Sequence, residues 1–166
     1  MVLLDPSMRI LVLNCGSSSV KFQLIETDLD RIDRNEDLIL TRGIVEKLGS
    51  HEAVVSCKAG ARTVRDVGLE LLDHHGAITR ILAMLQSTGA MKDPKEIQAV
   101  GHRVVHGGDF RSSQLITPAV LKNIEEAVEL APLHNPHNLR GYYVCAQLFP
   151  DRLQVTGSIP ALGPTG

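Results

Sequence analysis

The segment from Asn14 to Lys21 gathers residue types that can bind phosphate and a metal ion. Gly16 permits a positive φ and a close approach of the backbone to a ligand. Hydroxyl and backbone N–H groups around such a turn are donors suited to phosphate oxygens, and Asn14 can offer an oxygen to hydrated Mg²⁺ while Lys21 adds a positive charge. An ordinary polar hairpin turn explains the same composition equally well. Three successive serines fill the turn: Ser17, Ser18 and Ser19.

A second candidate site lies in the segment 101–108, which reads Gly-His-Arg-Val-Val-His-Gly-Gly. On a strand, alternate side chains share a face, so Arg103 and Val105 point one way while His102 and His106 point the other. The guanidinium of Arg103 can bind a carboxylate through two hydrogen bonds, and Val105 can contact a short alkyl group. The alternatives are a structural ion pair for Arg103 and ordinary hydrogen bonds, not a metal site, for the histidines. The same ordinary assignment applies to the pair His74-His75.

The segment Pro132-Leu133-His134-Asn135-Pro136 is the third candidate. A possible cap residue followed by proline predicts that a helix begins at Asn135-Pro136. His134 then lies just before a helix N-terminus, where unpaired N–H groups favour an anion. Without other signals, an unremarkable histidine in a loop would be the default interpretation.

These segments must be positioned by an α/β domain. The apolar patterns predict a strand meander followed by alternating helices and strands, hence a mixed sheet with helices packed on it. Charged residues 28–36 are expected to form a loop, and Thr117-Pro118 to begin a helix. Strands are expected at 9–13, 20–26, 37–45, 52–57 and 97–105, and further helices at about 67–86 and 135–148.

Composition narrows the class of protein. A net charge of −2 and 3% aromatic residues provide no basic or stacking surface for nucleic acid, and no apolar run approaches the roughly 20 residues of a membrane span. The cysteines form no CxxC pair, which is typical of reduced thiols in a cytosolic protein. We therefore expect a cytoplasmic protein with neither a nucleic-acid nor a membrane partner. The three cysteines are Cys15, Cys57 and Cys145.

The first and last segments differ from the rest of the chain. Residues 1–7 carry no basic region and are expected to be an N-terminal extension, with Met8 as the true start. Residues 8–151 are expected to form the domain. Residues 152–166 are rich in Ser, Pro, Gly and Thr and are expected to be irregular.

Taken together, Asn-x-Gly-Ser-Ser-Ser-x-Lys, His-Arg-Val-Val-His-Gly-Gly and Pro-Leu-His-Asn-Pro resemble the signatures of the acetate kinase family. The resemblance covers residues 8–151 and implies a ribonuclease H-like (actin-like ATPase) fold, truncated here. It implies transfer of phosphate between ATP and acetate, giving ADP and acetyl phosphate, with Mg²⁺ at Asn14. The turn serines and Lys21 would bind nucleotide phosphates, Arg103 the carboxylate, and Val105 and Leu133 the methyl group. His134 would contact the transferred phosphoryl group.

The family also requires residues that do not occur here, above all a Phe-Asp-Thr strand with a catalytic aspartate. We therefore expect an N-terminal fragment that is inactive alone, and one that lacks much of the surface through which family members form homodimers. Residues 157–160 depart from the family pattern. A shifted reading of inferred codons there would encode Phe-Asp-Thr, so a frameshift near 155–157 is a hypothesis. The alternatives are a propionate or butyrate kinase fragment and a non-catalytic remnant.

Overall fold

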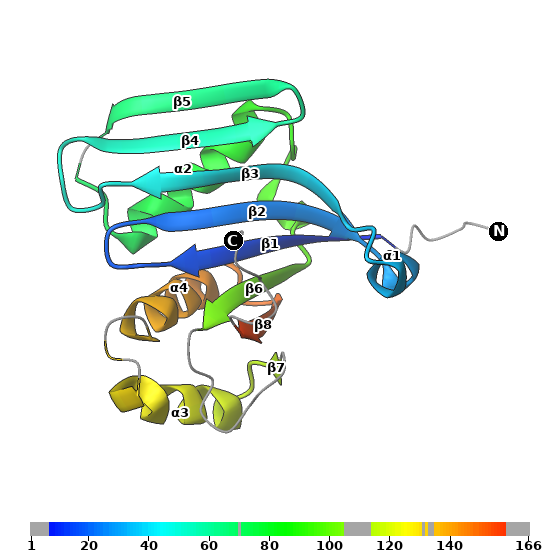
Figure 1. Cartoon of the computed structure of the whole chain (residues 1–166), viewed down its shortest axis with the longest axis vertical. Coiled ribbons are helices and arrows are strands. Elements are labelled where there is room, and N and C mark those ends of the chain that lie inside the picture. The colour runs from blue at the N-terminus through cyan, green and yellow to red at the C-terminus, as the bar shows by residue number, and fades with distance from the viewer. Residues whose placement is uncertain (1–6, 70, 105–113, 131, 133–134, 159–166) are drawn as a thin grey trace.

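The structure, a computed structural model, describes residues 7–69, 71–104, 114–130, 132 and 135–158. Within these residues the chain forms one eight-stranded sheet, in the order β5-β4-β3-β2-β1-β6-β8-β7 (Figure 1). The strands are β1 (Met8–Cys15), β2 (Val20–Thr27), β3 (Leu38–Glu46), β4 (Ala53–Ala59), β5 (Arg62–Leu69), β6 (Ala99–Val104), β7 (Gln114–Leu115) and β8 (Leu153–Ser158). The helices are α1 (Leu29–Arg34), α2 (His74–Ser87), α3 (Pro118–Glu126) and α4 (Asn135–Leu148), with 3₁₀ turns η1 (Pro94–Glu96) and η2 (Ala127–Leu130).

The sheet is mixed, as the sequence predicted. Strands β1 to β5 form an antiparallel meander, whereas β6 runs parallel to β1, and β8 runs parallel to β6. The short β7 closes the other edge antiparallel to β8. The carboxyl ends of β1, β6 and β8 therefore lie at the same end of the sheet (Figure 1).

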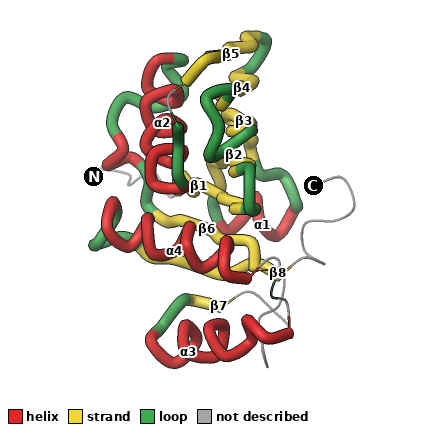
Figure 2. Tube along the Cα trace, turned by 90° about the vertical axis from the view of Figure 1, so that its left-hand side faces the viewer, coloured by secondary structure: helices red, strands yellow, loops and turns green. Residues whose placement is uncertain are grey.

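One face of the sheet is covered by α2 and α4. On β1, Leu11, Leu13 and Cys15 are buried, and they share one hydrophobic cluster with α2 and α4. This alternation is the pattern expected for a strand with one face in the core. Figure 2, which views the sheet from its side, shows α2 standing against it. Helix α3 packs on α4 through Ile124 and Leu139 in a smaller cluster.

The predicted loop at 28–36 is wrong, because residues 29–34 form α1. The carboxylate of Asp28 accepts a hydrogen bond from the Arg31 amide at 2.8 Å, which caps the first turn. Asn35 then has a φ of 56°, a left-handed conformation that ends the helix. Both signals are local and compatible with a charged sequence, so composition alone did not distinguish a loop from a short helix.

The predicted helix at 67–86 is correct only from His74 onward. Val67 belongs to edge strand β5 and Leu71 to the connection after it, and both are exposed. Helix α2 begins where the Asp73 carboxylate accepts a hydrogen bond from the Gly76 amide at 2.7 Å. The apolar spacing that suggested a longer helix came from two different elements.

The expectation of irregular structure from residue 152 is also wrong for Leu153–Ser158. These residues form β8, which is bonded to β6 on one side and to β7 on the other. Hydrogen bonding to two neighbouring strands stabilises a strand of low intrinsic propensity. Within the described residues the other predicted strands are confirmed, and so are the helix starts at Thr117-Pro118 and Asn135-Pro136.

Candidate active site

The candidate residues that the structure describes lie at the carboxyl ends of β1 and β6 and at the turn that follows β1. In open sheets with parallel strands, ligands bind preferentially at this end. The first turns of α2 and α4 reach the same end of the sheet from its other face. The order and direction of the strands therefore bring together segments that are up to 123 residues apart in the sequence (Figure 1).

Residues 16–19, called here the serine turn, join β1 to β2. Two carbonyl groups of this turn accept backbone hydrogen bonds. The Gly16 amide donates to the Ser19 carbonyl at 2.8 Å, and the Leu48 amide donates to the Ser18 carbonyl at 3.0 Å. Ser17 and Ser18 are exposed, while Ser19 is half buried. The turn does not use the positive φ that glycine allows: Gly16 is not among the residues with positive φ. A Cβ there would lie 3.5 Å from Ser19 Oγ, an ordinary contact.

Two further side chains, neither of them predicted as a site residue, hold this turn from the side of α2 and α4. Asn138, in the first turn of α4, donates through Nδ2 to the Cys15 carbonyl at 2.8 Å. His74, the first residue of α2, lies with Nε2 2.7 Å from the Gly16 carbonyl oxygen. Both side chains are almost fully buried. An ordinary hydrogen bond was expected for His74 and is confirmed, but neither its partner nor the contact of Asn138 was predictable, because the contacts span 58 and 123 residues.

Asn14, Lys21 and Arg103 lie on the sheet face opposite α2 and α4. Asn14 is paired directly with Lys21 in the β1–β2 ladder. Leu13 is paired with His102 in the parallel ladder, so the next residues, Asn14 and Arg103, are neighbours on the other face. Lys21 is exposed, whereas Asn14 and Arg103 are half buried. The register thus places one amide and two cationic side chains side by side.

The Arg103 guanidinium is incompletely bonded. Its Nε is buried and has no hydrogen-bond partner among the residues that the structure describes. A buried donor without a partner costs free energy, and a carboxylate would satisfy it through the two-pronged geometry of a guanidinium. The alternative assignment of Arg103, a structural ion pair, is not found within the described part of the chain.

His102 makes an ordinary buried hydrogen bond, as expected. Its Nε2 lies 2.7 Å from Gln154 Oε1 on β8, and its ring meets Tyr142 edge-on. Burial lowers the pKa of His102 to about 4, although the hydrogen bond to Gln154 opposes that shift. The ring is therefore neutral at physiological pH. No group of three or more potential metal-binding side chains is found in the described ranges.

Three predicted site residues fall outside the described residues: Val105, Leu133 and His134. His106 lies outside them as well. The β6 residues that precede Val105 and the helix that follows His134 are nevertheless placed at the end of the sheet already described. Their assigned roles remain predictions.

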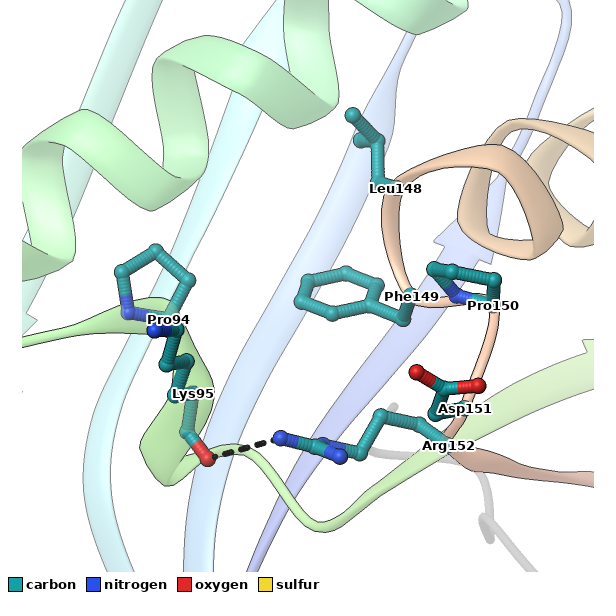
Figure 3. Close-up of a pocket in the computed structure, with 7 residues that line it drawn as sticks. All are labelled: Pro94, Lys95, Leu148, Phe149, Pro150, Asp151 and Arg152. Atoms are coloured by element: carbon teal, nitrogen blue, oxygen red, sulfur yellow. Dashed lines mark hydrogen bonds between the residues drawn. The ribbon is translucent and has the colours of Figure 1, made fainter.

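A separate pocket of about 250 Å³ lies at the opposite end of the sheet, before β6 and β8 begin (Figure 3). Its lining includes Lys95, Phe149 and Arg152. The Arg152 guanidinium donates to the carbonyls of Ile97 at 2.8 Å and Lys95 at 3.3 Å. Arg152 therefore links η1 to the start of β8, and the pocket has no part in the candidate active site.

Comparison with known proteins decides the family. The model of the acetokinase family matches residues 9–157 of this chain. The chain belongs to the acetokinase family. Its members are kinases, so the chain derives from a transferase family with the mixed α/β architecture described above.

Individual acetokinases agree with this assignment. The acetate kinase of Thermoanaerobacterium thermosaccharolyticum is 46% identical over 147 residues, which are 87% of this chain and 35% of that protein. The crystal structure of Porphyromonas gingivalis acetate kinase has a TM-score of 0.82 at 39% identity, covering 91% of this chain and 37% of that one. A propionate kinase from Francisella tularensis has a TM-score of 0.77 at 36% identity, covering 91% of this chain and 36% of that one. The chain thus spans about a third of the length of the relatives that it matches.

Proposed function

We propose that this chain provides the phosphate-binding turn and the carboxylate-binding arginine of an acetate kinase-type phosphotransferase. The observation that carries the proposal is the register of β1 against β2 and β6, which sets Asn14, Lys21 and Arg103 side by side on one sheet face. A cation next to a donor-rich turn suits a reaction between two anions, a carboxylate and a nucleotide phosphate. Acetate with ATP is the substrate pair that the family membership favours.

Each residue has a defined task in this proposal. Arg103 binds the carboxylate, and its unpartnered Nε provides one of the donors. Val105 and Leu133 contact the methyl group, and His134 stabilises charge on the phosphoryl oxygens. Ser17, Ser18, Ser19 and Lys21 bind the nucleotide phosphates. Phosphoryl transfer depends mainly on such positioning and charge stabilisation.

Mg²⁺ fits this arrangement as an ion that is carried by the nucleotide. Asn14 would offer it one amide oxygen, and the ion would neutralise phosphate charge when bound. Lys21 and Arg103 lie next to Asn14, and no cluster of acidic or histidine ligands is found in the described residues. Mg²⁺ commonly binds with few protein ligands while keeping water and phosphate oxygens.

The test separates binding from turnover. Titration of the ¹⁵N-labelled chain with Mg·ADP should shift the amides of the serine turn, and titration with acetate should shift the Arg103 Nε–H signal. Lys21→Ala should weaken the response to ADP, whereas Lys58→Ala, which removes an exposed lysine from β4, should not. Absence of any response to ADP or acetate would overturn the proposal.

Turnover is a separate matter, since the Phe-Asp-Thr strand expected from the family is not found in these 166 residues. We therefore expect the chain alone to produce no measurable ADP in a coupled assay with ATP, Mg²⁺ and acetate. Ordinary kinase rates would refute this expectation, and would show that the missing carboxylate is not essential.

Propionate is a second candidate substrate, because 36% of a propionate kinase chain matches this chain with a TM-score of 0.77. One methylene changes binding by only about 1–3 kcal/mol in an apolar pocket. Parallel titrations with acetate and propionate would rank the two substrates by affinity.

A cytoplasmic location is part of the proposal, supported by three buried, unpaired cysteines. No helix in the described residues is long and apolar enough to cross a membrane.

A further inference from the structure

The carbonyl groups of the serine turn are bonded in a way that fixes the direction of its N–H groups. In a trans peptide the C=O of one residue and the N–H of the next point in opposite directions. The Gly16 carbonyl points to His74, so the N–H of Ser17 points away from the helices. The Ser18 carbonyl points to the Leu48 amide, so the N–H of Ser19 points away from Leu48 in the same manner.

His74 is built into the fold as a donor. A carbonyl oxygen can only accept a hydrogen bond, so Nε2 of His74 carries the hydrogen. The side chain is 4% exposed, and it begins α2, whose N-cap is Asp73. No other described side chain contacts the Gly16 carbonyl through a hydrogen bond. The orientation of the Gly16–Ser17 peptide therefore depends on the imidazole.

The ring of His74 is itself held in place by α4. It stacks on the ring of His137, with centroids 5.9 Å apart and planes 11° from parallel. The next residue, Asn138, donates to the Cys15 carbonyl. The first turns of α2 and α4 thus hydrogen-bond to the consecutive carbonyls of Gly16 and Cys15. The two helices also contact each other.

We propose that His74 is a positioning residue, which turns the Gly16–Ser17 peptide so that the Ser17 N–H faces the nucleotide phosphate. Asn138 assists by fixing the preceding carbonyl. The inference rests on the proposed function, since it names what orients the phosphate-binding turn of that site. His74 does not touch the ligand, and its effect is transmitted through one peptide group.

Three single variants test the role of His74. His74→Phe keeps an aromatic ring against His137 but removes the donor. His74→Gln restores a donor, because the glutamine amide reaches close to the position of Nε2. His75→Phe is the matched control, since His75 is the neighbouring residue in α2 and is exposed. Each variant is titrated with Mg·ADP, and its melting temperature is measured in parallel.

We expect His74→Phe to weaken Mg·ADP binding about tenfold, in line with the loss of one hydrogen bond that orients the Ser17 N–H toward the phosphate. His74→Gln should recover most of the affinity, and His75→Phe should bind like the wild type. If His74 serves only packing, affinity will follow the melting temperature and glutamine will not rescue it. Unchanged affinity in His74→Phe, or a failed rescue by His74→Gln, overturns the inference.

Measurements without ligand allow the role of His74 to be tested independently of the proposed function. If the wild type does not respond to Mg·ADP, the proposed function fails. The role of His74 is then judged by ¹⁵N relaxation of the Ser17 amide, which should become more mobile in His74→Phe and return to wild-type order in His74→Gln. Equal mobility in the wild type and His74→Phe would refute the positioning role in either case.

Discussion

Acid should destabilise this protein through His102. This residue of β6 is 3% exposed, and its ring meets Tyr142 of α4. The free side chain has a pKa of 6.5, and burial lowers it to about 4 in the folded chain. Between these values the unfolded chain takes up a proton that the folded chain excludes, so the free energy of unfolding falls as the pH falls. At about 1.4 kcal/mol per pH unit, the unfolding free energy falls by about 3 kcal/mol between the two pKa values of His102.

Urea denaturation at several pH values from 4.5 to 7.5 measures this loss. His102→Gln removes the titrating ring but keeps an amide that can bond to Gln154, so it should lose the His102 component of the pH dependence. Carboxylates and exposed histidines contribute equally to both proteins and cancel in the difference. His75→Gln, which alters an exposed histidine, should keep the wild-type dependence.

The reasoning would be refuted if the difference in unfolding free energy between wild type and His102→Gln were constant from pH 4.5 to 7.5. Such a result would mean that His102 takes up a proton as readily in the folded chain as in the unfolded one. Above pH 6.5 the difference should be constant, because the ring is then neutral in both states.

Three further predictions concern packing, the candidate site and a helix cap. Gly43→Ala should lower the unfolding free energy by about 1–3 kcal/mol, because the added Cβ would lie 2.3 Å from a carbonyl oxygen of β4. Gly101→Ala should cost little, because the nearest atom to its added Cβ is 3.6 Å away. Equal losses for the two variants in urea denaturation would contradict this prediction. Arg103→Leu should not lower the melting temperature, since it removes a buried Nε that has no partner in the described residues. The same variant should abolish the chemical-shift changes that acetate induces. A large loss of stability would instead indicate a structural role for Arg103. Thr117→Ala should lower the unfolding free energy by about 1 kcal/mol, because it removes the N-cap of α3. Thr79→Ala, inside α2, should change the unfolding free energy very little. Chemical denaturation measures both variants, and equal effects would exclude the capping explanation.

The sequence predicted elements well where local chemistry was decisive. Leu11, Leu13 and Cys15 alternate with less buried residues along β1, and the Thr117-Pro118 pair marks the start of α3. It failed where the local signals could be assigned to either of two elements. Val67 and Leu71 fitted a helical stripe, yet β4 offers an edge with which residues 62–69 pair. Only the presence of that edge decides between strand and helix.

The candidate site divides in the same way. Residue type and order were sufficient to propose Asn14, the three serines, Lys21 and Arg103 as candidates, because phosphate and carboxylate binding require particular groups. His74 and Asn138 were not recognisable. Their partners are the backbone carbonyls of Gly16 and Cys15, and a backbone carbonyl is the same group at every position in the chain.

The sequence by itself thus determined which chemical groups the protein possesses, which segments form strands or helices with clear caps and alternation, and to which family it belongs. Tertiary structure decided which of these groups meet. The parallel alignment of β1 with β6 sets Arg103 beside Asn14, and the packing of α2 and α4 brings His74 and Asn138 to the serine turn. The physical reason is that register and helix packing depend on surfaces from distant parts of the chain, which exist only once the sheet has formed.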